Sequence, residues 1–320
     1  MSRNDKVFSV ITPVYNGAEF LQETLDSVLK YCNDYSFEYI VVNDGSTDQT
    51  SQILTKYADR IVVVDIINQG EANAVNTGLK MSTGKYCLVV SADDPLLSSE
   101  LFNEALIAFQ NDPSLVAVYP DWNVIDSDSH VVSQVQTMEY SKQALLEYFV
   151  CIPGPGTIFR TSVAKEIGGR NISFKYVSDY DFWLRLSEFG DFKRIPRVLA
   201  QWRNHANSTS ISNKGLEMAE ERIRVVENFL QLFPQPKSIE NSALAHAHYN
   251  ASLLAYFSND VPGARWMLKA IRFGKGRIEK ADLRIILFCL LLPFSRYILP
   301  LLKRLPIIRG MLKRRKNWIP

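Results

Sequence analysis

An α/β fold built on a mostly parallel sheet is predicted by three features of this 320-residue sequence. Short runs rich in β-branched residues recur along the first part of the chain, and they are too continuously apolar for strands with one solvated face. Patterns with a single apolar helical face separate these runs. Strands that alternate with helices favour a parallel sheet covered on both faces, and such sheets bind ligands beyond the carboxyl ends of their strands.

The chain begins with a strand, a helix, a second strand and a second helix. The strands are "VFSVITPVY" at 7–15 and "YIVVNDG" at 39–45, both apolar and β-branched. The segment between them, 19–32, places its leucines and a valine on one face and is therefore a helix. "TSQILTKYA" at 50–58 is a shorter helix of the same kind. The alternation that defines the fold class is thus present from the first residues.

The same alternation continues to about residue 125. "RIVVVDII" at 60–67 and "KYCLVVSADD" at 85–94 are the third and fourth strands, with a helix at 71–82 between them. The segment 99–110 opens with a Ser/Glu pair typical of a helix start, and "LVAVYPDWNVI" at 115–125 continues the series of strands. Five strand ends are therefore candidate positions for ligand-binding residues.

From about residue 214 only helical patterns remain, joined by turns that contain Pro and Gly. We predict an α/β domain over 1–213 and a helical appendage over 214–282. The remaining residues, 283–320, form a basic tail with nine Lys or Arg and no acidic residue. The net charge of the whole chain is +2, so residues 1–282 carry about −7. The tail and the body therefore need separate explanations.

The basic tail is predicted to lie on a membrane. Its apolar stretch 285–302 has 18 residues but contains Arg296 and two prolines, and a central Arg costs roughly 2.5–3.5 kcal/mol in a spanning helix. A segment lying in the membrane interface avoids this cost, with the basic residues on anionic lipid at about 1 kcal/mol each. The alternative is a helix that packs on the appendage and leaves a solvated basic end.

A cytoplasmic protein attached peripherally to the inner face of the membrane is the expected localisation. The four cysteines form no CxxC pair and lie in apolar or mixed contexts, which favours small core residues in a reducing compartment. The start "MSRNDK" runs into the first strand without the apolar stretch of a signal peptide. We assign the basic tail to lipid and expect no nucleic-acid partner.

Three of the predicted strands end on acidic residues. These are Asp44, Asp65 and the adjacent pair Asp93 and Asp94. Carboxylates at strand ends add nothing to sheet stability, so several on one edge indicate a site for a cation or for donor groups of a ligand. Hard oxygen ligands suit Mg²⁺ or Mn²⁺. Each motif alone also fits an ordinary turn or helix cap.

Seven short motifs, in this order and spacing, resemble the inverting family-2 glycosyltransferases over roughly residues 7–210. No single motif is specific for this family. The ordered set is specific, because each motif lies at a predicted strand end or loop. The motifs are "ITPVYN", "VVNDGSTDQT", "NQGEANAVNTGL", "SADDP", "PGPGTIFR", "SDYDFWLRLSEFG" and "WRNHANSTS". The resemblance implies a GT-A fold, a nucleotide-diphosphate-sugar donor, a divalent metal and a hydroxyl acceptor glycosylated with inversion.

Donor-binding residues follow from the same resemblance. Pro13 and Tyr15 would flank the nucleobase, with Tyr15 stacked on its face. Asp44 would accept a hydrogen bond from a ring N–H, which favours uracil or thymine and hence a UDP- or dTDP-sugar. Asn76 would border the ribose and diphosphate, unless its helix only covers the sheet. Asp93 would touch the ribose or the metal.

The metal would be held by Asp93, Asp94 and His205, although which of the two acids is a ligand stays open. Arg203 would pair with the diphosphate, since arginine forms charge-assisted hydrogen bonds with phosphate. Many relatives have a further Asp two positions before Asp93, whereas this chain has Ser91 there. Weaker or replaceable metal binding follows from that difference.

Asp179 in "SDYDFWLRL" is the predicted catalytic base. An inverting enzyme needs a base within about 2.6–3.2 Å of the acceptor hydroxyl, and the resemblance places it here, at the start of a helix. Ser178 stands where relatives have an acid, and Asp181 on another helical face ranks second. An acid that only stabilises the helix dipole is the alternative for Asp179.

The predicted function is transfer of one sugar from a UDP- or dTDP-sugar to a glycan or lipid-linked acceptor. The alternative is a nucleotide-sugar-binding scaffold with an impaired site, since Ser91 and Ser178 replace two acids. A nucleotidyltransferase lacks support because "TPVYNGAEF" has no Arg or Lys. A dinucleotide oxidoreductase lacks support because no GxGxxG follows a strand.

Overall fold

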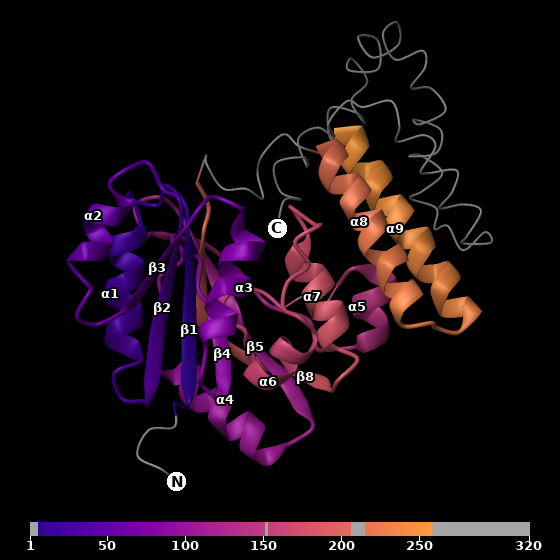
Figure 1. The fold of residues 1–320 in the computed structure, drawn as a ribbon. Helices are drawn as coiled ribbons and strands as arrows, with labels where there is room; N and C mark the ends of the chain where they lie inside the picture. The colour runs from indigo at the N-terminus through magenta and orange to yellow at the C-terminus, as the bar shows by residue number, and fades with distance from the viewer. Residues whose placement is uncertain (1–5, 151–152, 206–214, 258–320) are drawn as a thin grey trace, which may run out of the picture. The chain divides into compact units, whose positions relative to one another are not determined.

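The computed structural model describes residues 6–150, 153–205 and 215–257. The chain divides into two compact units, residues 1–212 with 224–235, and residues 213–223 with those from 236 onward. The first unit is an α/β sheet structure and the described part of the second is helical (Figure 1). The predicted domain boundaries at 213 and 282 stay predictions.

The first unit is built on an eight-stranded sheet, in the order β3-β2-β1-β4-β7-β5-β6 with β8 paired to β5. The four strands predicted from the first 94 residues are parallel neighbours, as expected. The strands are β1 (Phe8–Val14), β2 (Phe37–Asp44), β3 (Val62–Ile66), β4 (Tyr86–Val89), β5 (Leu115–Ile125), β6 (Val131–Val135), β7 (Ile158–Arg160) and β8 (Asp191–Arg203).

Seven helices begin in this unit. They are α1 (Leu21–Tyr31), α2 (Thr50–Thr55), α3 (Glu71–Met81), α4 (Glu100–Asn111), α5 (Lys142–Tyr148), α6 (Thr161–Glu166) and α7 (Ser178–Leu186), in the described part before residue 206. The first four coincide with the predicted helices. Helices α1 and α2 lie beside each other next to β1–β3 in Figure 1.

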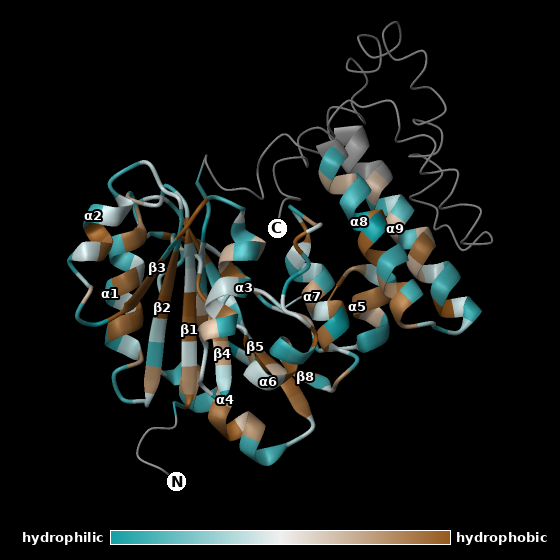
Figure 2. Ribbon diagram, in the orientation of Figure 1, coloured by the Kyte–Doolittle hydropathy of each residue, from teal (hydrophilic) through white to brown (hydrophobic). Residues whose placement is uncertain are grey.

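The two faces of the sheet are covered by different helices, as the strand period of two requires. Phe8 and Val10 of β1 pack in the main core with residues of α1 and α4. Ile40 and Val42 of β2 point to the other face and pack with Ala74 of α3. Because both faces are covered, every residue of β1 is buried. The strands are accordingly among the most hydrophobic parts of Figure 2.

The sheet is mixed beyond β4, a feature that the sequence pattern did not predict. β7 has only three residues and lies antiparallel between β4 and β5. A run of three residues is too short to show periodicity. β3 also differs from expectation, because it is the edge strand and Val62 is 44% exposed. Its continuous apolar run therefore does not mean burial on both faces.

The described part of the second unit is helical, as predicted for the appendage. Helix α9 (Lys237–Phe257) packs through Ala251 on Ala219 and Ile223 of α8 (Gly215–Leu232), whose remaining residues belong to the first unit. Residues 258–282 of the predicted appendage and the tail at 283–320 lie outside the described residues. Among the helices that are described, none has the length and apolarity needed to cross a membrane.

Candidate functional site

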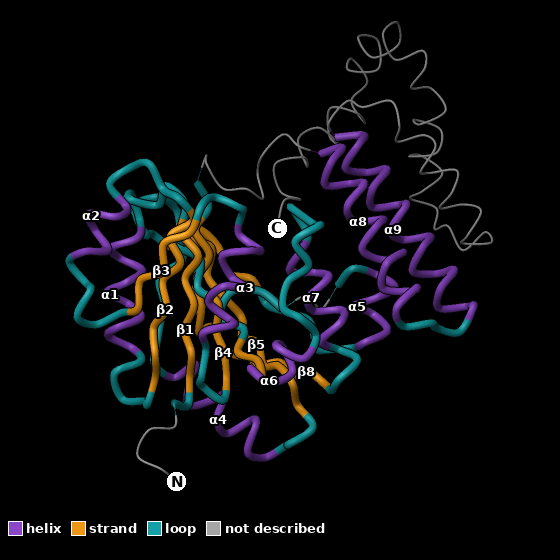
Figure 3. The backbone as a smooth tube through the Cα atoms, in the orientation of Figure 1, coloured by secondary structure: helices purple, strands orange, loops and turns teal. Residues whose placement is uncertain are grey.

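The predicted site residues from β1, β2 and β4 are brought to one edge of the sheet. β1 lies between β2 and β4 and runs parallel to both, so their carboxyl ends point the same way. Tyr15 follows β1, Asp44 ends β2, and Asp93 and Asp94 lie in the loop after β4. Figure 3 shows the loops that follow these strands gathered at this edge.

The loop after β1 is tied to the loop after β2 by Asn16. Its Oδ1 accepts hydrogen bonds from the Thr47 and Asp48 N–H groups at 2.7 and 3.3 Å, and its own N–H donates to Ser46 Oγ at 2.9 Å. Tyr15 is held at this junction with 53% of its surface exposed, so a ring face is available to a ligand. Pro13 is buried within β1, opposite Val42.

The Asp44 carboxylate holds the loop that leads into α3. Its Oδ1 accepts the Gln69 N–H and its Oδ2 accepts the Gly70 N–H, both at 2.8 Å. Gly70 has a φ of 90°, a left-handed value that favours glycine. Each carboxylate oxygen has a further lone pair. An N–H group of a nucleobase could therefore bind Asp44 without displacing the loop. The side chain is 3% exposed, so such a base would have to approach the sheet edge closely.

Asn76 of α3 binds the backbone of Arg170. Its Nδ2 donates to the Arg170 carbonyl and its Oδ1 accepts the Arg170 N–H, both at 2.7 Å. A Cβ on Gly169 would lie 2.2 Å from Asn76 Oδ1, so only glycine fits there. The Arg170 side chain pairs with Glu71 at 2.6 Å. The observed contacts of Asn76 are thus structural, and its predicted donor contact stays a prediction.

Asp179 lies in the first turn of α7 and has the electrostatic character expected of a base. Burial raises the pKa of its carboxyl, the Arg170 charge lowers it and the Glu71 charge raises it, with a net upward shift. The side chain keeps some exposed surface although protein surrounds it. A carboxyl with a raised pKa accepts a proton more readily than an ordinary one.

Asp181, the second-ranked acid on the same helix, is enclosed in an ion pair. It is 1% exposed, and its Oδ2 lies 2.6 Å from Arg185 Nη2. Arg185 also donates to the carbonyls of Ile167 and Gly169. Through Arg185, Asp181 therefore stabilises the loop before Arg170. Of the two acids, Asp179 is the one that retains exposed surface.

The adjacent acids Asp93 and Asp94 face different ways. Asp94 is buried, and its Oδ1 accepts the backbone N–H of Arg203 at 2.7 Å. Burial and the neighbouring Asp93 charge raise the pKa of Asp94 well above its ordinary value. The Asp93 side chain is 32% exposed, and its Oδ2 lies 2.9 Å from His205 Nε2. A carboxylate beside an imidazole, with solvent access, is a donor set that fits Mn²⁺ or a similar ion.

A second cluster suited to metal binding was not predicted. The ligand atoms of Asp126, Asp128 and His130 all lie within 4.8 Å of one another, whereas Asp93, Asp94 and His205 form no such group of three among the described residues. The Asp126 carboxylate accepts the N–H groups of Asp128 and His130, both at 2.9 Å. This geometry is that of a tight turn between β5 and β6.

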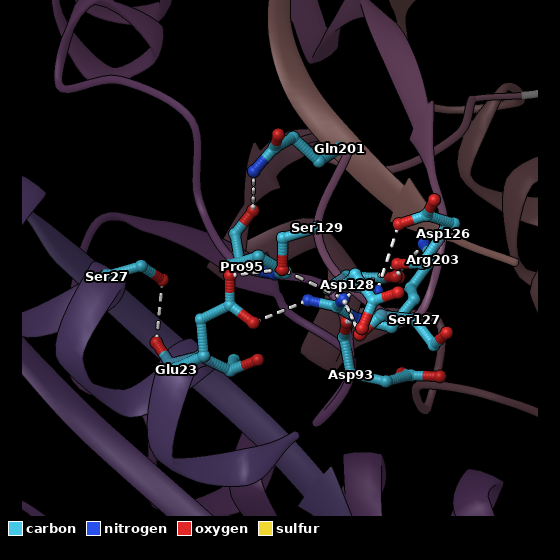
Figure 4. A network of polar contacts seen from close by, with 12 residues as sticks. Glu23, Ser27, Asp93, Pro95, Asp126, Ser127, Asp128, Ser129, Gln201 and Arg203 are labelled. Carbon is cyan, nitrogen blue, oxygen red and sulfur yellow. Dashed lines mark hydrogen bonds and ion pairs between the residues drawn. The ribbon is translucent and has the colours of Figure 1, made fainter. Parts of the chain in front are cut away.

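Arg203, predicted to pair with the diphosphate, is 0% exposed. Its guanidinium bonds to protein groups from three other segments, among them Glu23 and Ser129, which sequence reasoning missed (Figure 4). No local pattern identifies Glu23, because it lies 180 positions away and is one polar residue on an amphipathic helix. Phosphate binding by Arg203 stays a prediction, which its burial does not favour.

The model of the family described as Glycosyl transferase family 2 matches residues 9–168, half of the chain. The chain belongs to this family. A Rickettsia prowazekii protein named as an uncharacterized glycosyltransferase is 32% identical over 244 residues, covering 74% of this chain and 76% of the relative. The Escherichia coli chondroitin synthase is 29% identical over 229 residues, covering 69% of this chain and 32% of the synthase.

Two solved structures have a fold similar to that of this chain. Staphylococcus aureus TarS 1–349 in complex with UDP-GlcNAc has a TM-score of 0.57 at 18% identity, covering 83% of this chain and 89% of that one. The mannosyltransferase PcManGT from Pyrobaculum calidifontis, in complex with GDP-Man and Mn²⁺, has a TM-score of 0.58 at 17% identity, covering 92% and 84%. These structures confirm the predicted fold class, and the family model and the relatives confirm the predicted glycosyltransferase activity.

Proposed function

We propose that this family-2 glycosyltransferase moves a sugar, with inversion, from a UDP- or dTDP-sugar to a hydroxyl of a glycan or lipid-linked acceptor. The observation that carries the proposal is the position of Asp179. The charges of Glu71 and Arg170 both act on the pKa of its carboxyl. Glu71 directly follows Gly70, whose N–H donates a hydrogen bond to the Asp44 carboxylate. The proposed base is therefore linked through α3 to the edge where the proposed donor residues lie.

Tyr15, Pro13, Asp44, Asn76 and Asp93 are the proposed donor-binding residues. The half-exposed Tyr15 ring offers a stacking face, which is worth about 0.5–1.5 kcal/mol between aromatic rings. Asp44 accepts the ring N–H of a uracil or thymine, a group that adenine lacks at that edge. The UDP-GlcNAc complex of TarS and the chondroitin synthase relative support a uridine donor and a glycan acceptor.

A divalent ion, Mg²⁺ or Mn²⁺, is proposed to bind Asp93 and His205, with Asp94 as the third predicted ligand. The partly exposed Asp93–His205 pair supports this set, and so does the Mn²⁺ complex of PcManGT. The ion would supply positive charge to the leaving diphosphate. Asp93 and His205 would hold this ion at the sheet edge, and their two donor types favour an ion that accepts nitrogen as well as oxygen.

Asp179 is proposed to take the proton of the acceptor hydroxyl as that oxygen attacks the anomeric carbon. The bond from this carbon to the diphosphate oxygen breaks at the same time, and the nucleoside diphosphate leaves with the electron pair. Attack opposite the leaving group inverts the anomeric configuration. The raised pKa of Asp179 supports this role, since general-base action contributes typically about 10² to 10⁴-fold.

A donor panel tests the proposal. UDP- and dTDP-sugars are incubated with the full chain in Mn²⁺, in Mg²⁺ and in chelator, and release of the nucleoside diphosphate is measured. We expect release from one donor class only, dependent on the metal. Donor binding without any release, with every acceptor offered, would instead support the impaired scaffold that Ser91 and Ser178 suggest.

The C-terminal tail is proposed to hold the enzyme on an anionic membrane surface at the cytoplasmic face. The nine basic residues of 283–320 and the apolar stretch 285–302 support this proposal. Peripheral attachment would place the site next to a lipid-linked acceptor.

A further inference from the structure

Arg203, the last residue of β8, is a fully buried arginine in a position that requires explanation. It is 0% exposed, and it is among the largest fully buried side chains of the described residues. A buried charge is costly unless it is paired and its donors are bonded. The hydrogen-bond partners of Arg203 therefore show which segments of the chain this side chain fixes in place.

The guanidinium connects the acidic loop after β4 to two other segments (Figure 4). Its Nε donates to the Asp93 carbonyl at 2.8 Å, and its Nη2 donates to Glu23 of α1 at 2.7 Å. Its Nη1 donates to the turn after β5, at 2.9 Å to the Asp126 carbonyl and 3.0 Å to Ser129 Oγ. Three segments far apart in sequence are thus joined by one side chain.

The backbone of Arg203 holds the same loop a second time. Its N–H donates to Asp94 Oδ1 at 2.7 Å. One residue therefore holds both acids, Asp94 through its carboxylate and Asp93 through its carbonyl. The Asp93 carboxylate is left to face outward, 2.9 Å from the imidazole of His205, two residues after Arg203.

We propose that Arg203 is a positioning residue that fixes the loop 91–94, turns Asp94 inward, and presents Asp93 and His205 together as a cation-binding pair. This inference rests on the metal site of the proposed function but assigns Arg203 no contact with the donor. Fixing this loop is a role that a buried guanidinium can have, and it takes the place of the phosphate contact predicted from the sequence.

Further bonds to the same loop show that its conformation is held from both sides. Thr24 Oγ1 of α1 donates to the Ala92 carbonyl at 2.9 Å, and Gln201 Nε2 of β8 donates to the Pro95 carbonyl at 3.2 Å. Arg203 is the one charged member of this set, and its planar group also lies 4.5 Å from the Phe20 ring centroid. A lysine has no planar fork and could satisfy only some of these acceptors.

The test is Mn²⁺ binding by the full-length protein, followed by the electron paramagnetic resonance signal of free Mn²⁺ without donor. R203K keeps the charge and loses the fork. We expect about 10- to 100-fold weaker Mn²⁺ binding, the range for residues that orient metal ligands. The matched control is R197K on the same strand, whose arginine is 46% exposed and pairs with Glu100 and Glu104. R197K should bind Mn²⁺ as the wild type does.

A second background separates positioning from general destabilisation. In D93N, whose metal ligand is already lost, R203K should weaken the remaining Mn²⁺ binding by less than twofold. If R203K weakens Mn²⁺ binding as much in D93N as in the wild type, Arg203 does not act by positioning Asp93, and the inference is overturned. If R203K does not unfold cooperatively, E23Q carries the test, because Glu23 is 45% exposed and its replacement leaves the arginine in place. Weaker Mn²⁺ binding in E23Q supports the inference, and unchanged binding overturns it.

The outcomes separate this inference from the proposed function. Wild-type binding of Mn²⁺ with equal binding by R203K would refute the positioning role and leave the glycosyltransferase site intact. No Mn²⁺ binding by the wild type, with or without UDP, would refute both the metal site and the inference. The donor panel would then show whether transfer occurs without a metal.

Discussion

Asp179 and Asp181 are two acids of one helix turn whose surroundings give them different chemistry. Burial raises the pKa of both carboxyls, but Asp181 has Arg185 at 2.6 Å and almost no exposed surface. Within the part of the chain that the structure describes, Asp179 has no such direct ion pair, and it keeps some access to solvent. A proton acceptor needs that access, so the two positions can be distinguished by mutation.

D179N should abolish transfer, with a loss of about 10² to 10⁴-fold, and leave donor binding nearly unchanged. Its thermal stability should not fall, because a raised pKa means that the ionised carboxyl is disfavoured in the fold. Calorimetric donor titration and a transfer assay measure the two effects. D181N is the comparison variant and should lower the unfolding free energy more than D179N does, because Asp181, unlike Asp179, has an ion-pair partner, Arg185, which the change leaves without that carboxylate. Full activity of D179N would end its assignment as the base.

The positions of several proposed site residues in the fold could be predicted from sequence, because these residues lie at or just after strand ends. Asp44, Asp93 and Asp94 follow apolar runs, and the order of motifs placed Asp179 at a helix start, where it is found. The buried role of Arg203 could not be predicted. Its partners come from α1 and from the turn after β5, and only the folded chain brings them together.

At the scale of elements, α3 packs on β1 through a glycine. A Cβ on Gly78 would lie 2.5 Å from Cγ2 of Ile11, a buried β-branched side chain with little freedom to move. The helix can approach the sheet closely for this reason. The same helix carries Asn76 and begins at Glu71, so its distance from the sheet determines where the loop of Arg170 lies.

G78A should lower the unfolding free energy by about 1–3 kcal/mol through overpacking. Intrinsic helix propensity alone predicts the opposite, a gain of about 1 kcal/mol, so the sign of the effect decides whether close packing dominates. Denaturant unfolding measures it. The double variant with I11A removes the atoms that clash, so adding G78A to I11A should cost nothing or stabilise. An equal cost of G78A in both backgrounds would contradict the packing argument.

Near the opposite edge of the sheet, Glu38 of β2 is hydrogen-bonded to β1 and to the turn that precedes β4. It accepts hydrogen bonds from Ser9 Oγ, from Thr83 Oγ1 at 3.0 Å and from the Gly84 N–H at 3.1 Å. Burial alone would raise the pKa of Glu38, but the hydrogen bonds from Ser9, Thr83 and Gly84 lower it below the ordinary value. The carboxylate form is therefore the one that stabilises the fold.

E38Q should lower the unfolding free energy at pH 7 by about 1 kcal/mol, a modest value because the group is partly exposed. A lowered pKa stabilises the fold above the pKa of the unfolded state, and this contribution is lost as pH falls through the folded value. The difference between E38Q and the wild type should therefore shrink below about pH 4. Thermal unfolding at both pH values measures it, with E166Q in α6 as an exposed control. A difference that does not change with pH would contradict the charge-based explanation.

The parallel half of the sheet was predictable and the mixed half was not, for a physical reason. β1 to β4 are separated by amphipathic helices, and that alternation specifies a parallel arrangement. β7 is three residues long, and β8 pairs parallel to β5 after an interval of more than sixty residues. Such pairings depend on long-range contacts that a local pattern does not contain.

For the whole molecule, the separation of charge along the chain has a consequence for where the enzyme works. The basic tail is predicted to bind anionic lipid while the acidic remainder of the chain is repelled by it. Replacing Lys313, Arg314, Arg315 and Lys316 with Gln in the full chain should weaken binding to phosphatidylserine vesicles by about 4 kcal/mol at most, less when salt is added. Vesicle sedimentation measures it. Zwitterionic vesicles are the control, and equal binding of the variant to anionic vesicles would contradict the electrostatic role.

In the proposed reaction, Asp179 takes the proton of the acceptor hydroxyl while the diphosphate leaves from the opposite face of the sugar. The most direct measurement is the anomeric configuration of the first transfer product, read by proton NMR from an α-linked nucleotide sugar. We expect a β-linked product from the wild type and no product from D179N. An α-linked product would contradict the proposed reaction.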